Sequence, residues 1–203
     1  MAHIKTADQL RQVYKLPKGR SIEKVIKEFE THTRNFIAHS PFLIIGTTRS
    51  DGVGDVSPRG EEPGFVKILD DITLAIPDRP GNNRLDTLSN ILERPAVGLI
   101  FLIPGVNETL RINGEAEIRD DDDLREIFDV NGRLPATVLV VKVNEIYLHC
   151  AKALMRSRLW DEDAKIERSE FPTMGEMIRD QINADTEAET QDAMVARYER
   201  MLY

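Results

Sequence analysis

Hydrophobic residues follow two different periods along this chain. Between residues 42 and 150 they fall in short runs separated by turn residues, a pattern typical of an antiparallel β core. Outside that stretch they recur at spacings of three and four, which indicates amphipathic helices. The predicted strands are Phe42–Thr48, Asp55–Pro58, Phe65–Leu69, Ile72–Ile76, Val97–Ile103, Thr109–Arg119, Thr137–Val143 and Ile146–Cys150. Many short strands with few helices between them favour a small barrel, because a closed sheet exposes no edge.

Three turn sequences predict how these strands pair. Ser50-Asp51-Gly52 and Asp70-Asp71 each predict a tight hairpin between neighbouring strands. Pro104-Gly105 predicts a third turn, which joins the two strongest strands. The predicted fold class is therefore mainly β, with flanking helices.

Two helices are predicted before the first strand. Thr6 and Gln9 form a capping box for a short helix, which ends before Pro17. Ser21 is expected to begin a longer helix that Pro41 closes. The apolar face of the longer helix contains Ile22, Val25, Ile26, Phe29, Phe36 and Ile37.

Two more helices are predicted near the C-terminus. Thr173 with Glu176, and Thr186 with Glu189, are capping boxes that open them. Both helices are too polar to stand alone, so they are expected to dock on the core or on a second subunit. The chain is thus expected to form one domain, residues 1–203. Its parts are N-terminal helices in 1–40, the barrel in 41–160 and a helical extension in 161–203.

The stretch that follows Ile72–Ile76 has the features of an anion site. A helix is predicted to begin near Asn83 or Arg84 and to end at Pro95, with Leu85, Leu88, Ile91 and Leu92 on one face. The first turn of a helix has N–H groups without partners and attracts anions. Asn82 and Asn83 add amide donors, Gly81 lets a ligand approach the main chain, and Arg79 and Arg84 add guanidinium groups that suit a phosphate. The alternative interpretation is that an asparagine caps the helix and the arginines are solvated or pair with Asp86.

Two other basic segments each allow two interpretations. Ser57 and Arg59 lie at a predicted strand end beside Pro58. In one interpretation the Arg59 guanidinium reaches a ligand, and in the other it remains at the surface beside Glu61. A second cluster contains Lys152, Arg156, Arg158 and Trp160. In one interpretation of that cluster, the indole stacks on a planar ligand while the cations bind its anionic tail. In the other, the segment is a hinge and Trp160 packs on the barrel.

Composition limits the classes of protein. No apolar run approaches the roughly 18 residues of a membrane helix, and the first residues lack the apolar block of a signal peptide, so a cytoplasmic protein is expected. The net charge of −8 disfavours nucleic-acid binding. Cys150 is the only cysteine and is predicted to be buried, which excludes an intrachain disulfide and a cysteine zinc cage. His32 and His39 have no further ligand at a metal spacing, so no metal site is predicted.

The ordered set of segments resembles the FMN-binding split-barrel superfamily that includes pyridoxamine 5′-phosphate oxidase. Within it, the sequence is similar to the family of flavin-nucleotide-binding proteins. The segments that carry the resemblance are 55–60, 76–84 with the helix to 95, 98–105, 109–116 and 149–160, which cover about half of the chain. The resemblance implies a six-stranded, antiparallel, Greek-key-like split barrel that forms homodimers with FMN in the groove between subunits.

The resemblance also implies roles for particular residues. Ser57 and Arg59 match the strand that meets the flavin and its phosphate. Gly81, Asn82, Asn83 and Arg84 match the phosphate-binding turn before the helix. Lys152, Arg156, Arg158 and Trp160 match the segment that closes the flavin pocket from the other subunit. The chain lacks the Arg and His near a C-terminal Pro that pyridoxamine phosphate oxidases use, which argues against vitamin B6 oxidation.

The resemblance thus implies an FMN-dependent oxidoreductase that acts on a small molecule. The flavin ring would carry the redox chemistry, and no catalytic side chain is identified in the sequence. A flavin carrier or sensor without turnover is an alternative. A deazaflavin- or haem-binding split barrel is another, and haem would need His32, His39 or His149 as an axial ligand.

Overall fold

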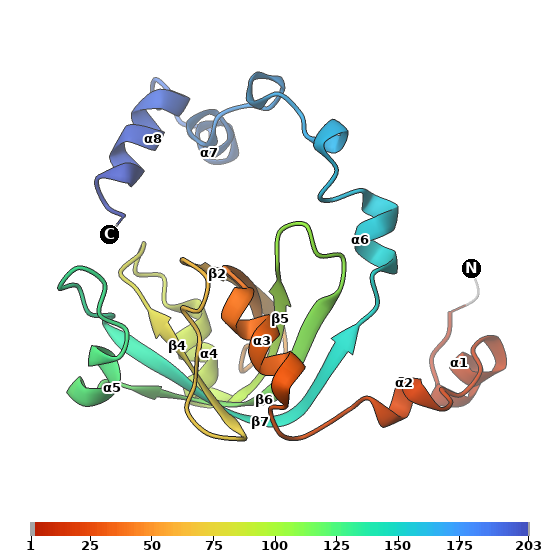
Figure 1. Cartoon of the computed structure of the whole chain (residues 1–203). Coiled ribbons are helices and arrows are strands. Elements are labelled where there is room, and N and C mark those ends of the chain that lie inside the picture. The colour runs from red at the N-terminus through yellow and green to blue at the C-terminus, as the bar shows by residue number, and fades with distance from the viewer. Residues whose placement is uncertain (1–2, 203) are drawn as a thin grey trace.

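One antiparallel sheet of seven strands forms the centre of the molecule (Figure 1). The computed structural model describes residues 3–202. The strands are β1 (Phe42–Thr48), β2 (Gly54–Gly60), β3 (Lys67–Ile68), β4 (Thr73–Asp78), β5 (Ala96–Leu102), β6 (Thr109–Arg119) and β7 (Thr137–His149). Their order in the sheet is β2-β1-β5-β6-β7-β4-β3. The antiparallel sheet with flanking helices confirms the predicted fold class.

The sheet has seven strands, one more than the six that the resemblance implies. The additional strand is β3, whose two residues pair with Ala75 and Leu74 of β4. Phe65 and Val66 were predicted to belong to this strand, but they are buried outside it. A strand this short adds little to the sheet, so the split-barrel architecture is retained.

The last two predicted strands form one continuous strand of thirteen residues, β7, so the predicted break between them was wrong. Asn113 pairs with Glu145, but the next residue of β6, Gly114, pairs with Val143, so Asn144 is an extra residue in β7. This is the two-versus-one arrangement of a β-bulge, which bends a strand without ending it. A Cβ on Gly114 would lie 2.3 Å from the carbonyl oxygen of Lys142, so the main chains approach closely here.

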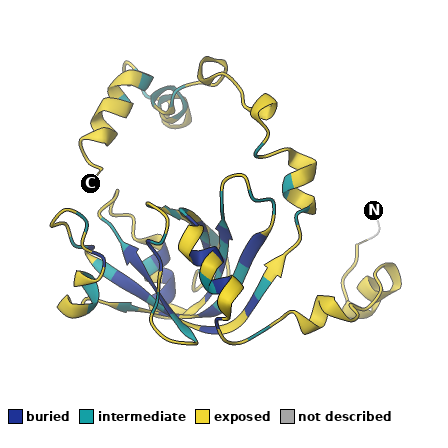
Figure 2. Cartoon of the chain, in the orientation of Figure 1, coloured by how far each residue is buried: buried dark blue, intermediate teal, exposed yellow. Residues whose placement is uncertain are grey.

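The hydrophobic core lies inside the curved sheet. In β1 every second residue, Leu43, Ile45 and Thr47, is buried, as the two-residue period of a strand requires. Phe36 and Ile37 of helix α3 (Thr31–His39) and Ile91 of helix α4 (Asp86–Glu93) join the same core. Figure 2 shows the buried positions gathered on the strands and on these two helices.

The longer N-terminal helix is absent, because the chain leaves the helical conformation in the middle of it. Between residues 3 and 30, α1 (Ala7–Val13) and α2 (Arg20–Glu23) are the only helices. Ile26 then pairs with Ile146, with main-chain hydrogen bonds of 2.9 and 2.8 Å in the two directions. These bonds use the N–H and C=O groups that a helix would need. Helix α3 begins separately, with Glu30 and Thr33 forming its capping box.

Helices α5 (Asp122–Glu126) and α6 (Lys152–Ser157) flank β7, and two 3₁₀ turns, η1 (Glu162–Ala164) and η2 (Arg168–Glu170), follow α6. Cys150 is exposed, which corrects the prediction that it is buried. The residue follows the last position of β7, where the chain leaves the sheet.

The C-terminal segment forms an arch that stands away from the sheet and ends in α7 (Met174–Ile182) and α8 (Gln191–Glu199) (Figure 1). The capping box of Thr173 and Glu176 is confirmed. The second predicted box is wrong, because Thr190 rather than Thr186 caps α8. Neither α7 nor α8 contains a buried residue. The arch is tied to the barrel where the Trp160 indole donates to the carbonyl of Val106 at 3.0 Å and where Arg133 donates to that of Leu202 at 3.1 Å.

Candidate functional site

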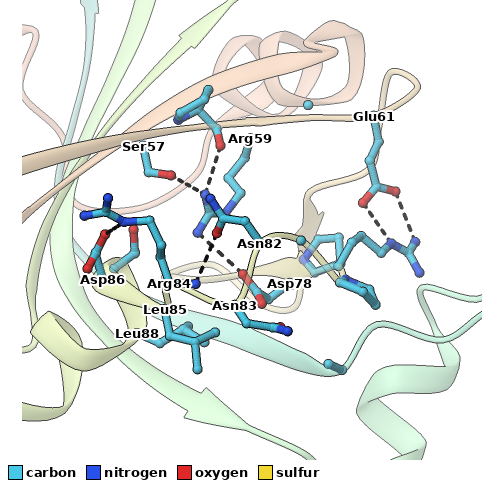
Figure 3. A pocket seen from close by; sticks show the side chains of 18 of the residues that line it. Ser57, Arg59, Glu61, Asp78, Asn82, Asn83, Arg84, Leu85, Asp86 and Leu88 are labelled. Atoms are coloured by element: carbon cyan, nitrogen blue, oxygen red, sulfur yellow. Dashed lines mark hydrogen bonds and ion pairs between the residues drawn. The ribbon is translucent and has the colours of Figure 1, made fainter. Parts of the chain in front are cut away.

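A cavity of about 610 Å³ lies between β2 and the loop that joins β4 to α4 (Figure 3). Its walls come from residues 55–61 of β2 and its end, residues 77–88, and Phe65 and Ala136. The strands β2 and β4 are not neighbours in the sheet order, so the cavity marks the open seam of the barrel. Seven residues predicted from sequence line it: Ser57, Arg59, Arg79, Gly81, Asn82, Asn83 and Arg84.

Strand β2 presents alternate residues to this cavity. Asp55, Ser57 and Arg59 are half-buried, while Val56 and Pro58 between them are exposed. The guanidinium of Arg59 donates to the Ser57 hydroxyl and to the carbonyl of Pro58. Two donors of the guanidinium are therefore directed along its own strand.

Arg59 also forms an ion pair across the seam. Its Nη2 lies 3.5 Å from Oδ1 of Asp78, and the two side chains are 21% and 16% exposed. Burial raises the pKa of Asp78, and the nearby Arg59 guanidinium opposes that rise. The Nε of Arg59 is buried and has no hydrogen-bond partner within the described part of the chain. One donor of this arginine, close to the cavity wall, is thus buried without a partner in residues 3–202.

Arg79 is held by the protein itself. Its Nε and Nη2 donate to the two carboxylate oxygens of Glu61 at 2.9 and 3.0 Å, a bidentate pair that is almost completely buried. Nη1 and Nη2 also donate to the carbonyls of Arg133 and Phe128. This network fixes the loop after β4 against the end of β2, so Arg79 shapes the wall of the cavity.

The loop before α4 has an unusual main chain. Asn83 and Leu85 both adopt the left-handed conformation, with φ of 59° and 57°. The Oδ1 of Asn82 accepts a hydrogen bond from the N–H of Arg84 at 3.1 Å, so this asparagine stabilises the turn itself. Helix α4 begins at Asp86, later than predicted, and Leu85 at its N-cap position gives it no side-chain cap. The alternative interpretation, in which an asparagine caps the helix, is therefore wrong on this point.

Arg84 points into solvent at the mouth of the cavity. Its Nε donates to Oδ2 of Asp86 at 2.7 Å, and the side chains are 75% and 49% exposed. Hydrogen bonding to Asp86 raises the pKa of the Arg84 guanidinium further. Because the pair is exposed, water screens it, and an anion is able to compete with Asp86 for the guanidinium.

The second basic cluster lies elsewhere in the same chain. Helix α6 stands on the side of the barrel where β7 ends, apart from β2 and β4 (Figure 1). Arg158 is left-handed and pairs with Asp161 and Asp163, whereas Trp160 bonds to Val106. Lys152 and Arg156 are exposed and form no ion pair within residues 3–202. The structure does not bring this cluster to the cavity of its own chain.

Sequence reasoning missed the carboxylates of the cavity wall. Asp78 pairs with Arg59 and Glu61 pairs with Arg79, and Asp55 lies two residues before Ser57, on the same face of β2. Asp78 directly follows the predicted strand and Pro77, so its position at a strand end was the available signal. Its partner, 19 residues earlier, was not visible from spacing.

Residues 3–202 contain no group of three side chains suited to hold a metal ion. No helix in this described range has the length and apolarity needed to cross a bilayer.

An antiparallel sheet open at one seam, with a cavity there, defines a split-barrel protein. The family model for pyridoxamine 5′-phosphate oxidase matches residues 29–150. The match covers more than half of the chain, and the chain belongs to this family. No curated protein matches the sequence significantly.

Solved structures with related folds are distant from this chain. A putative pyridoxamine 5′-phosphate oxidase from Lactobacillus delbrueckii has 19% identity and a TM-score of 0.49, covering 60% of this chain and 95% of its own. An F420 reductase has 18% identity and a TM-score of 0.44, covering 58% and 98%. A pyridoxamine 5′-phosphate oxidase-related, FMN-binding protein from Nostoc punctiforme has 14% identity and a TM-score of 0.37, covering 55% and 74%. At these values the likeness carries no information about ligand or activity.

Proposed function

We propose that this chain is an FMN-binding flavoprotein that acts as an oxidoreductase on a small molecule. The proposed site is the seam cavity, in a homodimer whose second subunit completes it. The observation that carries this proposal is the cavity itself, where the unpaired Nε of Arg59 and the exposed guanidinium of Arg84 lie beside the open main chain at Gly81. Its volume falls within the roughly 300–1,000 Å³ typical of small-molecule sites.

The residues of the cavity suit a planar group with an anionic tail. Arg84 and the uncapped start of α4 are the proposed phosphate ligands, because a free first turn and a guanidinium both attract anions. A Cβ on Gly81 would meet no atom within 4 Å, so a ligand is able to approach the main chain there. Ser57 and Arg59 are proposed to face the ring, with Phe65 and Leu88 as apolar wall.

The charge balance of the cavity supports completion by a second subunit. Apart from the Arg79–Glu61 pair, two arginines, Arg59 and Arg84, face three carboxylates, Asp55, Asp78 and Asp86. A dianionic phosphate would favour additional cations. Lys152 and Arg156, which have no carboxylate partner in the described range, are the proposed source from the other subunit. Arg158 and Trp160 would then position that helix.

When bound, FMN would supply hydride or electron transfer at its ring. This chain would bind the phosphate through Arg84, orient the ring against β2 and exclude water with Phe65 and Leu88. The half-buried Arg59 would place a positive charge beside the ring and favour its anionic forms electrostatically. None of these tasks needs a nucleophilic side chain.

The test is the visible absorption spectrum of the purified protein, followed by denaturation and mass analysis of the released chromophore. The proposal expects FMN, bleaching by NADH or NADPH, and a dimer in sedimentation. A colourless protein that takes up neither FMN nor deazaflavin contradicts the proposal. A yellow protein that no pyridine nucleotide or chemical donor turns over would instead be a flavin carrier.

A further inference from the structure

The two ends of the described chain carry opposite charge. Residues 3–28, the N-terminal arm, contain seven lysines and arginines and three acidic residues, a net charge of +4. Residues 161–202, the C-terminal tail, contain twelve acidic residues and five basic ones, a net charge of −7. The chain as a whole has a net charge of −8, so the basic arm stands out against an acidic protein.

The basic residues of the arm lack carboxylate partners. No lysine or arginine of residues 3–28 forms an ion pair with any residue from 3 to 202. Two of these side chains instead donate to carbonyls, Arg11 to Lys15 and Lys24 to Leu148. The positive charge of the arm is therefore uncompensated in a single chain.

The tail keeps unpaired carboxylates because most of its few basic residues pair with other carboxylates of the tail. Its arginines and lysine are used largely within the tail, in pairs such as Arg179 with Asp180 and Arg197 with Glu189. Asp185, Glu187 and Asp192 form no ion pair within the described range. These carboxylates lie in and beside the connection between α7 and α8, so their negative charge is concentrated there.

Both segments also expose apolar side chains that a soluble helix normally buries. In the arm, Val13, Tyr14 and Leu16 are 63%, 60% and 66% exposed. In the tail, Ile178 and Ile182 on α7 are 47% and 67% exposed. The seven residues of α1 are too few for a stable isolated helix in water, so its helical form requires a packing partner. Arm and tail thus match in charge and in apolar surface.

A single chain does not join its arm to its tail. Figure 1 shows α1 and α2 beside the end of β7 and α7 and α8 on the far side of the barrel, at the end of the arch. The arm joins the barrel at Ile26, which pairs with Ile146 of β7, and Lys24 donates to the carbonyl of Leu148, so the base of the arm lies against β7 and not against α7. A second copy related by two-fold symmetry would offer its tail to this arm and receive the partner arm in return.

We propose that the basic N-terminal arm of one subunit docks on the acidic C-terminal helices of a second copy of this chain. The contact places Val13, Tyr14 and Leu16 against the exposed apolar side of α7, and the arm cations against the carboxylates near Asp185. The proposal rests on the homodimer of the proposed function, but it does not depend on FMN.

Complementary charge reversals test this exchange between subunits. The arm variant carries Arg11→Glu, Lys15→Glu and Lys18→Glu, and the tail variant carries Asp185→Lys, Glu187→Lys and Asp192→Lys. Each variant alone should dimerise about tenfold more weakly than wild type in sedimentation at low salt, since three surface pairs become repulsive. Mixed in equal amounts, the two variants should recover the wild-type affinity as a heterodimer, because both arm–tail contacts then join opposite charges. The matched control, Arg49→Glu, Lys67→Glu and Lys142→Glu, reverses exposed charges on the barrel and should dimerise as wild type does.

Several outcomes would overturn the exchange. The arm variant alone dimerising with wild-type affinity would overturn it. A mixture that dimerises as weakly as each variant would also overturn it, because a contact within one chain stays repulsive in both variants when they are mixed. Arm-dependent binding of wild type to anionic lipid vesicles, without an effect on dimerisation, would assign the arm to a membrane surface instead.

Cross-linking provides a second measurement if a reversed variant fails to fold. In a Cys150→Ser background, a chain with Leu10→Cys and a mass-tagged chain with Ile178→Cys should be joined by a flexible thiol cross-linker. A chain with Leu92→Cys, also exposed but on α4, should not be joined to the Leu10→Cys chain. The flavin spectrum separates the two proposals, because a yellow dimer without the expected cross-link contradicts only the exchange.

Discussion

The Nη2 of Arg59 lies 3.5 Å from the Oδ1 of Asp78, and this ion pair connects two strands, β2 and β4, that are not neighbours in the sheet. A second ion pair, between Glu61 and Arg79, lies just beyond the ends of the same two strands. Together they hold the two sides of the open seam at a fixed separation (Figure 3). The cavity proposed to bind FMN thus has walls that are set by side-chain pairs, because the strands there share no ladder.

Replacing Arg84 tests the proposed phosphate site. Arg84→Ala should weaken FMN binding by about 1.5–3 kcal/mol, the contribution of a hydrogen bond to a charged group. Fluorescence titration of the apoprotein with FMN measures this change. Arg49→Ala, which removes another exposed arginine paired with an aspartate, is the matched control and should bind FMN as wild type does. Unchanged affinity in Arg84→Ala would remove this residue from the site.

Breaking the buried pair beside the seam should destabilise the fold. Glu61→Ala leaves the guanidinium of Arg79 without its carboxylate in a largely buried position, which should cost about 3 kcal/mol of unfolding free energy. Urea denaturation measures the loss. Glu117→Ala removes one of the two carboxylate partners of the exposed Arg119 and should change the unfolding free energy by less than about 1 kcal/mol. Equal losses in the two variants would show that Arg79 has no special role at the seam.

Asp78 should make stability depend on pH. Burial raises its pKa in the folded state, so the folded protein binds more protons than the unfolded chain above about pH 4, the ordinary aspartate range. Its contribution to unfolding free energy therefore falls as the pH rises through the raised pKa. Asn at this position does not titrate, so Asp78→Asn should gain stability relative to wild type as the pH is raised from 4.

The opposite sign is expected at Asp70, where a hydrogen bond from the N–H of Ile72 lowers the pKa. Its stabilising contribution is present above the unfolded pKa and is lost as the pH falls through the lowered one. Asp70→Asn should therefore lose stability relative to wild type as the pH rises. Urea denaturation of both variants between pH 3 and 7, in steps of about one unit, measures the two trends. Parallel curves for wild type and Asp78→Asn would refute the assignment at Asp78.

Gly114 should not tolerate a side chain. A Cβ there meets the main chain of Lys142 at 2.3 Å, and this carbonyl belongs to the bulged part of β7. Gly114→Ala should therefore destabilise the barrel by about 1–3 kcal/mol, the cost of overpacking. Gly54→Ala, where an added Cβ meets no atom within 4 Å, should have a melting temperature close to that of wild type. Thermal unfolding of both variants gives the comparison.

The local elements were largely predictable because their signals are local. The two-residue period gave β1 and β6 with their observed bounds, and Pro104-Gly105 gave the hairpin between β5 and β6. The loop of residues 79–84 was also predictable as a wall of one site, since its glycine, asparagines and arginines are contiguous. Whether that site holds FMN stays a proposal.

Other features depended on contacts between distant residues. The predicted helix from Ser21 failed because Ile26 exchanges main-chain hydrogen bonds with Ile146, and its apolar spacing carried no sign of that partner. The break after Val143 was wrong because a bulge opposite Gly114 absorbs the extra residue of β7.

The sequence by itself determined where strands and turns form, because period and turn residues reflect the preferences of neighbouring residues. The tertiary structure alone decided which carboxylates meet Arg59 and Arg79. Arg59 finds Asp78, and Arg79 finds Glu61, only because the curved sheet brings the ends of β2 and β4 together. The same curvature places α6 away from the cavity of its own chain, since β7 carries the chain to the other side of the barrel before α6 begins (Figure 1).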